Sequence, residues 1–220
     1  MYQFSLYAIC QYFGLLPAAI GVTLELSAIA LVASTALALP IAKARMSGWR
    51  IAALTARAYV ELFRNIPLLV LLYVYYFGLA EAGLHLSNFW AAVLALITNA
   101  AAYASEIIRA GYSTIPLGQR EAARSLGLRG WHVEAFVVLP QVVRVIIPPF
   151  ANHCIGVLIG SSIAAVIGVG DLSDWMLATG SESFRYMESF LVAALIYVAL
   201  CQAVAVMMAA LDRRNRTAAG

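Results

Sequence analysis

The chain has 220 residues, of which 63% are hydrophobic and only 11% are charged, and its formal net charge is +3. Soluble domains average roughly 45–50% apolar and about 25% charged residues. This composition excludes an ordinary soluble protein and predicts one membrane domain over residues 1–220, with no room for a second, soluble domain.

Five segments are apolar and long enough to cross a bilayer, since a helical span needs roughly 20 apolar residues. A barrel of strands is disfavoured, because the apolar runs are long and do not alternate with period two. The second segment is interrupted by the polar stretch 61–65 and by Pro67. We therefore expect an all-α membrane protein with five transmembrane helices, at about 15–41, 51–79, 88–110, 148–169 and 189–211.

Charged residues alternate in sign between successive connections. One set of connections is basic: Lys43, Arg45, Arg50, Arg120, Arg124, Arg129, Arg213, Arg214 and Arg216. The other set carries Glu81, Asp171, Asp174, Glu182 and Glu188, with Arg185 as its basic residue. The positive-inside rule then places the N-terminus outside and the C-terminus inside, in a multi-pass membrane protein. The acidic outer segment 171–188 is expected to be a solvated loop or a contact for an extracytoplasmic protein.

The longest cytoplasmic loop, about residues 111–147, contains two short predicted helices. Pro116 and Gly118 precede the first helix, and Gly127 can end it in a left-handed cap. Its alanines offer a smooth surface for close approach, and arginines surround it. The second helix, about 131–139, is expected to end or kink at Pro140. This shape suits docking against another protein, although an amphipathic loop with arginines on lipid phosphates has the same composition.

The spacing of this loop resembles the EAA loop of binding-protein-dependent ABC importer permeases. The matching positions are Glu121, Ala122, Ala123, Gly127, Val137, Leu139 and Pro140. Val137 replaces the isoleucine that is usual in that family. Four further blocks resemble the uptake permeases for polar amino acids of the histidine, glutamine and arginine type: GVTLELS at 21–27, YVELFRNIPLL at 59–69, AYASEIIR at 102–109 and IPLGQREAA at 115–123.

The resemblance implies a type I ABC importer permease fold, in which the EAA helix is the coupling helix that sits in a groove of an ATPase subunit. Glu121 and Arg124 would make polar contacts there, Ala122 and Ala123 would allow close packing, and Gly127 would set the turn. The implied partners are two ABC ATPase subunits, a second permease chain (homologous or identical) and an extracytoplasmic amino-acid-binding protein. Membrane lipid surrounds the chain, and no nucleic-acid partner is expected.

The chain has no phosphate-binding motif of the form G-x-x-x-x-G-K-[ST]. We therefore expect no enzyme activity and no cofactor on this chain, with ATP and Mg²⁺ bound by the partner ATPase. A metal site is also not expected, because the histidines and cysteines lack ligand spacing.

Ionisable and polar residues inside the spans are costly and are functional candidates. Two groups share one helical face each through i, i+4, i+7 spacing: Arg57, Glu61 and Arg64, and then Asn99, Tyr103 and Glu106. Such groups form internal ion-pair ladders and interhelical hydrogen bonds, or they line a path where a zwitterionic amino acid meets both signs of charge. The candidate path residues are Glu25, Glu61, Arg64, Asn99, Tyr103, Glu106, Asn152, Ser161 and Ser162.

The fourth span departs from the pattern of the resembling family, which reads Leu-Lys-Asp-Thr-Ser-Leu. Here Ile159 and Gly160 replace the lysine and the aspartate. Either a partner chain supplies the substrate site, or the substrate differs, or Gly160 and Ser161 allow tight helix packing.

Three functions are compared. The first is the permease subunit of an ATP-driven importer for a polar or charged amino acid or a close derivative. The alternative is a stand-alone secondary transporter coupled through Glu61 and Glu106. Transporters of this kind often contain internal repeats, and no convincing repeat is found in this sequence. An intramembrane enzyme built on Ser161, Ser162 and His153 ranks last, because their spacing is not diagnostic.

Overall fold

The structure is a computed structural model that describes residues 2–217, and the side chain of Arg216, counted above among the basic residues, lies outside the described part. Within residues 2–217 every regular element is helical, as expected. The first half contains η1 (Leu6–Leu15), α1 (Leu16–Arg45), α2 (Arg50–Asn65), α3 (Leu68–Tyr73), η2 (Val74–Gly78), α4 (Leu79–Glu81) and α5 (Asn88–Ser113). The second half contains α6 (Leu117–Ser125), α7 (Gly130–His132), η3 (Val133–Val138), α8 (Leu139–Gly160), η4 (Ser161–Ile167), α9 (Leu172–Ser183) and α10 (Tyr186–Thr217).

Four continuous helical stretches of the described chain are long and apolar enough to cross a membrane: Leu6–Arg45, Asn88–Ser113, Gly130–Ile167 and Tyr186–Asn215. A fifth candidate is the pair Arg50–Asn65 and Leu68–Glu81, which is bent by 103°. The bend falls at Pro67, as the sequence suggested, because proline lacks the N–H that would continue the hydrogen-bond ladder. The expected count of five thus holds only if this bent pair is one span.

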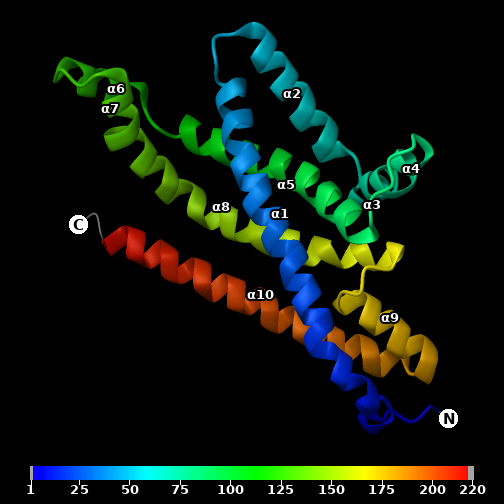
Figure 1. Cartoon of the computed structure of the whole chain (residues 1–220). Helices are drawn as coiled ribbons and strands as arrows, with labels where there is room; N and C mark the ends of the chain where they lie inside the picture. Colours follow the sequence, from blue (N-terminus) through cyan, green and yellow to red (C-terminus); the bar gives the residue numbers. More distant parts are fainter. Residues whose placement is uncertain (1, 218–220) are drawn as a thin grey trace.

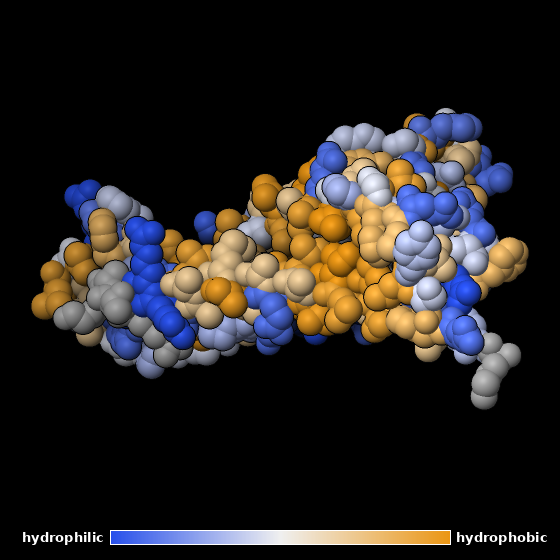
Figure 2. All heavy atoms as spheres, turned by 90° about the horizontal axis from the view of Figure 1, so that it is seen from below, coloured by the Kyte–Doolittle hydropathy of each residue, from blue (hydrophilic) through white to orange (hydrophobic). Residues whose placement is uncertain are grey.

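The long helices cross one another in an elongated bundle whose two chain ends lie on opposite sides (Figure 1). The α1–α2 turn and the α6–α7 segment lie away from the N-terminus, and α9 lies close to it (Figure 1). Figure 2 shows hydrophobic residues across the middle of one face and hydrophilic residues gathered toward two opposite ends. This distribution fits a protein whose middle lies in hydrocarbon and whose ends lie in water.

Helices α1 and α5 form the closest pair in the bundle, through small side chains. The buried positions of α1 recur every three or four residues and include Ala30, Ser34, Ala38 and Ala42, none of which is exposed. Small residues let two backbones approach closely, which replaces the hydrophobic driving force that is missing between helices in lipid. Helix α5 also has buried small residues: Ala91, Ala92, Ala95, Ala100, Ala101, Ala102, Ala104 and Ser105.

The fourth span, predicted to begin near Pro148, lies within a longer helical stretch that runs from Gly130 to Ile167. Helix α8 begins at Leu139 and runs through Pro148 and Pro149 as one helix. Prolines remove backbone donors, but transmembrane helices tolerate them because neighbouring helices and local adjustments satisfy the freed carbonyls.

The outer segment 171–188 was expected to be a solvated loop or a contact surface, and the first alternative was wrong for two of its four acidic residues, whereas Glu182 is exposed. Asp171 and Glu188 are fully buried. Asp171 caps α9 by accepting a hydrogen bond from the Asp174 N–H at 2.9 Å. Glu188 accepts hydrogen bonds from the Tyr2 hydroxyl and from the Ser5 N–H. The acidic side chains therefore hold the N-terminal segment and α9 in place.

Candidate functional site

The first short helix predicted in this loop is present as α6, which follows Pro116 and ends at Ser125. Gly127 has φ +83°, in the left-handed region that favours glycine. Its N–H bonds the Arg124 carbonyl at 2.9 Å, and the Leu128 N–H bonds the Ala123 carbonyl at 3.2 Å. These two bonds form a Schellman motif, so the expected left-handed cap is confirmed.

The two alanines of the motif point in different directions. Ala123 is buried and packs with Ile115, Val133 and Val138. Ala122 is exposed. The close-approach surface expected from both alanines is therefore formed by Ala122, while Ala123 fixes α6 on the following helix.

The exposed side of α6 carries both signs of charge and one large apolar side chain. Glu121 and Arg124 are exposed beside Ala122. Leu126 is 84% exposed, although it is fully apolar. A single exposed apolar side chain is ordinary on a protein surface, so Leu126 alone does not mark a partner contact.

Leu139 and Pro140 lie where the second short helix was expected to end or kink, and the first of these alternatives was wrong. The π-helical turn η3 precedes them, and α8 continues without a break. A π turn shifts the carbonyls by one residue, which accommodates a proline that cannot donate. The Val137 carbonyl accepts a hydrogen bond from the Gln141 side chain at 2.7 Å. Leu139 and Pro140 are both exposed at the base of the α6–α7 segment.

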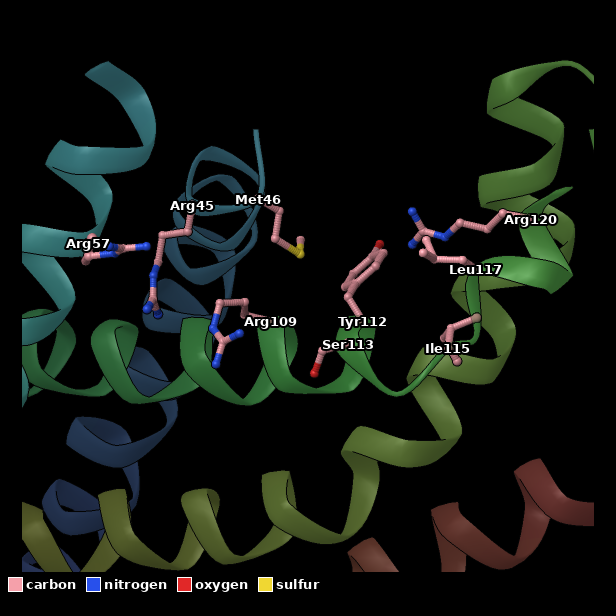
Figure 3. A pocket seen from close by; sticks show the side chains of 9 residues that line it. All are labelled: Arg45, Met46, Arg57, Arg109, Tyr112, Ser113, Ile115, Leu117 and Arg120. Atoms are coloured by element: carbon pink, nitrogen blue, oxygen red, sulfur yellow. The ribbon is translucent and has the colours of Figure 1, made fainter. Parts of the chain in front are cut away.

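Most candidate path residues line cavities along α5. The central cavity, about 470 Å³, is bounded by Leu68, Leu96, Asn99, Ala100, Tyr103, Ile107, Pro149, Asn152, His153, Gly156, Val157 and Gly160. The Glu61 cavity, about 340 Å³, is bounded by Arg45, Val60, Glu61, Arg64, Asn65, Tyr103 and Glu106. The arginine cavity, about 620 Å³, is bounded by Arg45, Met46, Arg57, Arg109, Tyr112, Ser113, Ile115, Leu117 and Arg120 (Figure 3). Tyr103 lines both the central cavity and the Glu61 cavity, and Arg45 lines both the Glu61 cavity and the arginine cavity. The three cavities therefore lie in a row.

Asn99 and Tyr103 make the interhelical hydrogen bonds that were one of their two interpretations. The Asn99 side chain donates to the Phe63 carbonyl at 2.9 Å, and the Tyr103 hydroxyl donates to the Arg64 carbonyl at 3.3 Å. The Phe63 carbonyl needs this donor because the residue four positions later is Pro67, which has no N–H. The two side chains thus stabilise the bend of the second candidate span and still face a cavity.

The expected ion-pair ladder of Arg57, Glu61 and Arg64 is absent from the described residues, so that interpretation was wrong. Glu106 instead pairs with Arg45 and Arg109. Glu61 and Arg64 are exposed near the end of α2, and the guanidinium of Arg64 lies 5.0 Å from the centre of the Tyr103 ring. Arg45 was assigned to a loop by its position after an apolar run. No local pattern signals its partner, which lies 61 residues away.

Three candidate path residues lie apart from these cavities. Glu25 is on an exposed face of α1. Ser161 is fully buried and donates to the Leu158 carbonyl at 2.7 Å. Ser162 lines a separate, mostly apolar groove of about 440 Å³ between α8 and α10, with Cys201 and Gln202. These positions suit helix packing or a contact between chains.

The wall of the central cavity holds no carboxylate and no guanidinium. Gly160 stands there, at the place where the resembling family has aspartate. A side-chain carbon at Gly160 would lie 3.4 Å from the Leu68 side chain, which is ordinary contact. His153 also lines this wall, and its Nε2 is buried without a hydrogen-bond partner among the described residues.

Comparison with known proteins gives the class of this membrane bundle. The family model described as binding-protein-dependent transport system inner membrane component matches residues 34–217. The chain belongs to this family. It is a non-catalytic, multi-pass component of the inner membrane, and the EAA positions of α6 are consistent with that membership.

Similar curated proteins are transport permeases along nearly their whole length. The probable amino-acid ABC transporter permease protein YckA of Bacillus subtilis (strain 168) is 37% identical over 89% of this chain and 86% of its own length. The arginine transport system permease protein ArtQ of the same organism is 34% identical over 90% of this chain and 91% of its own length. The nopaline transport system permease protein NocM of Agrobacterium fabrum (strain C58 / ATCC 33970) is 34% identical over 86% of this chain and 83% of its own length.

Solved structures agree with the architecture. A crystal structure of an amino acid ABC transporter with histidines matches with a TM-score of 0.90 at 34% identity, covering 97% of this chain and all of that one. An inward-facing structure of the MetNI methionine ABC transporter matches with a TM-score of 0.75 at 21% identity, covering 92% of this chain and 97% of that one. The second similarity supports the fold alone.

Proposed function

We propose that this chain is the membrane-spanning subunit of an ATP-driven importer that takes up a polar or charged amino acid, or a close derivative. The printed names of its relatives include an arginine permease and a nopaline permease, which supports an amino-acid-like substrate for this chain. A stand-alone carrier is not favoured, because the family is defined by transport systems that depend on a binding protein.

The observation that carries the proposal is the exposed and rigidly held α6. Ala123 and the turn at Gly127 fix the helix on its own chain, which leaves Glu121, Ala122 and Arg124 free to contact a partner. In this proposal α6 is the coupling helix and sits in a groove of an ATPase subunit, which binds ATP and Mg²⁺. Leu139 and Pro140 support the base of that contact.

The rest of the assembly follows from the same proposal. Two ATPase subunits act on two permease chains, this one and an identical or homologous copy, each with its own α6. An extracytoplasmic binding protein delivers the amino acid at the end that carries the N-terminus and α9. Residues 1–220 act as one domain with the N-terminus outside and the C-terminus inside, and the connection of about 111–147 contains the docking surface.

The substrate path in this proposal follows the cavities along α5. The Glu61 cavity presents a carboxylate and a guanidinium, Glu61 and Arg64, on one wall. A zwitterionic amino acid needs both signs of charge for recognition. The central cavity adds uncharged polar groups, those of Asn99 and Asn152. Glu106 is held between two arginines, so its role is to shape the wall between cavities.

The proposal is tested by charge reversal on α6 in a reconstituted complex. The full chain is co-expressed with its candidate ATPase and permease partners, and ATP hydrolysis is measured in proteoliposomes with substrate-loaded binding protein. We expect Glu121→Lys to reduce stimulated hydrolysis at least about tenfold, because one lost charge-assisted contact in a protein interface costs about 1.5 to 3 kcal/mol. Co-purification of the ATPase should fall in parallel.

Glu81→Lys is the matched control. Glu81 is exposed, as Glu121 is, and it is the last residue of α4, which lies far from α6 (Figure 1). It should leave both readouts near those of the native chain. Equal activity in the two variants would reject α6 as the coupling helix. Absence of any co-purifying ATPase, with folded protein in hand, would reject the importer itself.

A further inference from the structure

Helix α10 is the least covered of the four long apolar stretches in the described chain. Within the apolar part of each stretch, 6% of α10 is buried, compared with 28%, 61% and 39% of the other three. In Figure 1 α10 lies along the lower edge of the bundle, and the view from below in Figure 2 shows hydrophobic residues across the middle. Something other than the described part of this chain must therefore cover α10.

The surface of α10 is not uniformly apolar where it borders α8. A groove of about 440 Å³ lies between the two helices. Its walls are mostly apolar and include Ile155 and Ile159 of α8 and Val198 of α10. The hydroxyl of Ser162 and the carboxamide of Gln202 line the same groove. The groove therefore presents two uncharged polar groups on an apolar background.

These two polar side chains have no partner in the chain. Within residues 2–217 neither the Ser162 nor the Gln202 side chain makes a hydrogen bond. Gln202 is exposed and lies near the middle of the apolar run 189–211. An unsatisfied polar group in hydrocarbon is costly, and glutamine and serine inside membranes bond across to a neighbouring helix. Lipid tails supply no donor or acceptor, so the groove favours a protein helix over lipid as its cover.

The residue types in the groove indicate which protein this is. Two permease chains of the same orientation are related by a twofold axis along the membrane normal, so a residue near the axis meets its own counterpart at the same depth. A carboxamide and a hydroxyl each donate and accept, so Gln202 and Ser162 can each pair with their counterparts. A charged residue would repel its counterpart there, and no Asp, Glu, Lys or Arg lines the groove.

We propose that the groove between α8 and α10 is the surface on which a second copy of this chain docks. Gln202 of each copy bonds to its counterpart near the twofold axis, and the apolar walls pack around this pair. Ser162 adds a second polar contact along the same groove. This inference rests on the proposed function, which requires a second permease chain, and it adds the contact surface and the identity of that chain.

Pairing is measured on the full chain, fused after residue 220 to a donor or an acceptor fluorescent protein. The two forms are reconstituted together in phosphatidylcholine liposomes at decreasing protein-to-lipid ratios, and energy transfer gives an apparent Kd for pairing. Gln202→Leu removes the carboxamide, and Gln202→Asn keeps it on a shorter side chain. Ala194→Trp places an indole in the groove. Ala203→Trp is its matched control, because Ala203 is also an exposed alanine of α10 but lies outside the groove.

We expect the native chain to show saturable energy transfer. Gln202→Leu should weaken the apparent Kd by about threefold to thirtyfold, the range that one interhelical hydrogen bond in a membrane contributes. Gln202→Asn should keep most of the native affinity. Ala194→Trp should abolish saturable transfer at every ratio, because the indole occupies the space that the second copy needs. Ala203→Trp should pair as the native chain does.

Three results would overturn the proposal. A native chain that is monomeric at every ratio would leave the groove to lipid. Native pairing in both Gln202→Leu and Ala194→Trp would place the contact on another surface. A chain that is monomeric alone and pairs with a different permease chain would reject a second copy as the occupant.

Two controls keep these results interpretable. Ala194 and Gln202 are exposed in the single chain, so their replacement should not impair folding, and circular dichroism of each variant checks this. Gln202→Leu changes only a groove side chain and tests the surface even where the larger indole disturbs the helix. Glu121→Lys on α6 should leave energy transfer unchanged, so a failure of pairing and a failure of the proposed coupling to an ATPase are seen separately.

Discussion

Two short helices, α6 and α9, connect the long spans at opposite ends of the molecule, and they are built in opposite ways (Figure 1). Helix α6 has one buried residue, Ala123, and two of its charged residues, Glu121 and Arg124, are exposed. Helix α9 is packed between α1 and α10, and the acidic residue at its start is fully buried. In the function proposed above, a short charged connection thus serves a partner in one place and the chain itself in the other.

The buried helix is fixed by contacts to distant parts of the chain. The Leu172 N–H donates to the Thr23 hydroxyl at 3.0 Å, and the Trp175 indole donates to the Tyr12 carbonyl at 3.0 Å. No contact of this kind is found for the exposed side of α6 within residues 2–217. We therefore expect substitutions in α9 to change stability and substitutions on the outer side of α6 to change coupling.

The largest effect on stability should come from placing a charge on the buried side of α6, and the same charge on its exposed side is the comparison. Ala123→Asp buries a carboxylate in an apolar cluster, so the free energy of unfolding in detergent should fall by about 2 to 4 kcal/mol. Ala122→Asp leaves the new carboxylate in solvent and should change the free energy of unfolding by no more than about 0.5 kcal/mol. Denaturant titration of the two variants measures the contrast. Equal destabilisation would show that Ala122 is also part of the packed core.

The next effect is a pH dependence confined to α9. Burial raises the pKa of Asp171 from 3.8 to about 6. A carboxyl with a raised folded pKa binds its proton more tightly in the folded state, so stability is greatest below about pH 4. It falls as pH rises through 4 to 6 and is constant above that range, with a total loss of about 3 kcal/mol.

The Asp171→Asn variant tests the direction of this pH dependence. Asparagine also caps a helix, so the bond to the Asp174 N–H is kept while the ionisation is removed. The variant should match the native chain near pH 4 and exceed its free energy of unfolding by about 2 to 3 kcal/mol near pH 8. A variant that is less stable at both pH values would show that the ionised carboxylate is favourable at this site.

The same comparison explains which parts of the molecule could be predicted from the sequence. The spans, the α6 helix and the turn at Gly127 depend on local patterns, namely apolar runs, residue spacing and one glycine. Burial of Asp171 depends on Thr23 and Tyr197, and the position of Arg45 depends on Glu106, so both arise from contacts between distant segments. Acidic residues in a connection look solvated in a sequence, because the elements that cover them are not adjacent in the chain.

The cavities show the same limit. The helical spacing of Asn99 and Tyr103 placed them correctly on one face, since both line the central cavity. It also suggested an ion-pair ladder on α2, which is absent from the described residues, because Glu61 and Arg64 are exposed before the bend at Pro67 and make no ion pair with each other. Spacing determines which residues share a face of a helix, but the bend and the neighbouring helix determine what that face meets.

A smaller effect should separate two glycines. A side-chain carbon at Gly180 of α9 would lie 2.5 Å from the Tyr186 ring and 3.0 Å from the Ser189 hydroxyl. Gly180→Ala should therefore lower the free energy of unfolding by about 1 to 3 kcal/mol through overpacking. Gly118 of α6 has nothing within 4 Å of that position. Gly118→Ala should be neutral or stabilise by up to about 1 kcal/mol, and a loss there would place Gly118 against the rest of the chain.

The smallest effect concerns how the two helices end. Both enter the left-handed region, α6 at Gly127 with φ +83° and α9 at Phe184 with φ +57°. Gly127→Ala should cost about 1 to 2 kcal/mol, because a side chain is strained in that conformation. Phe184→Gly should relieve the same strain, and it loses little packing because Phe184 is 84% exposed.

The gain from Phe184→Gly should still be smaller than the loss from Gly127→Ala. Glycine increases the entropy of the unfolded chain, which offsets about 0.5 to 1 kcal/mol of the relief. We expect a net gain of about 0.5 kcal/mol, measured by the same detergent titration. A loss instead would mean that the exposed Phe184 ring makes a stabilising contact with lipid or a partner, and α9 would then share with α6 the task of meeting another molecule.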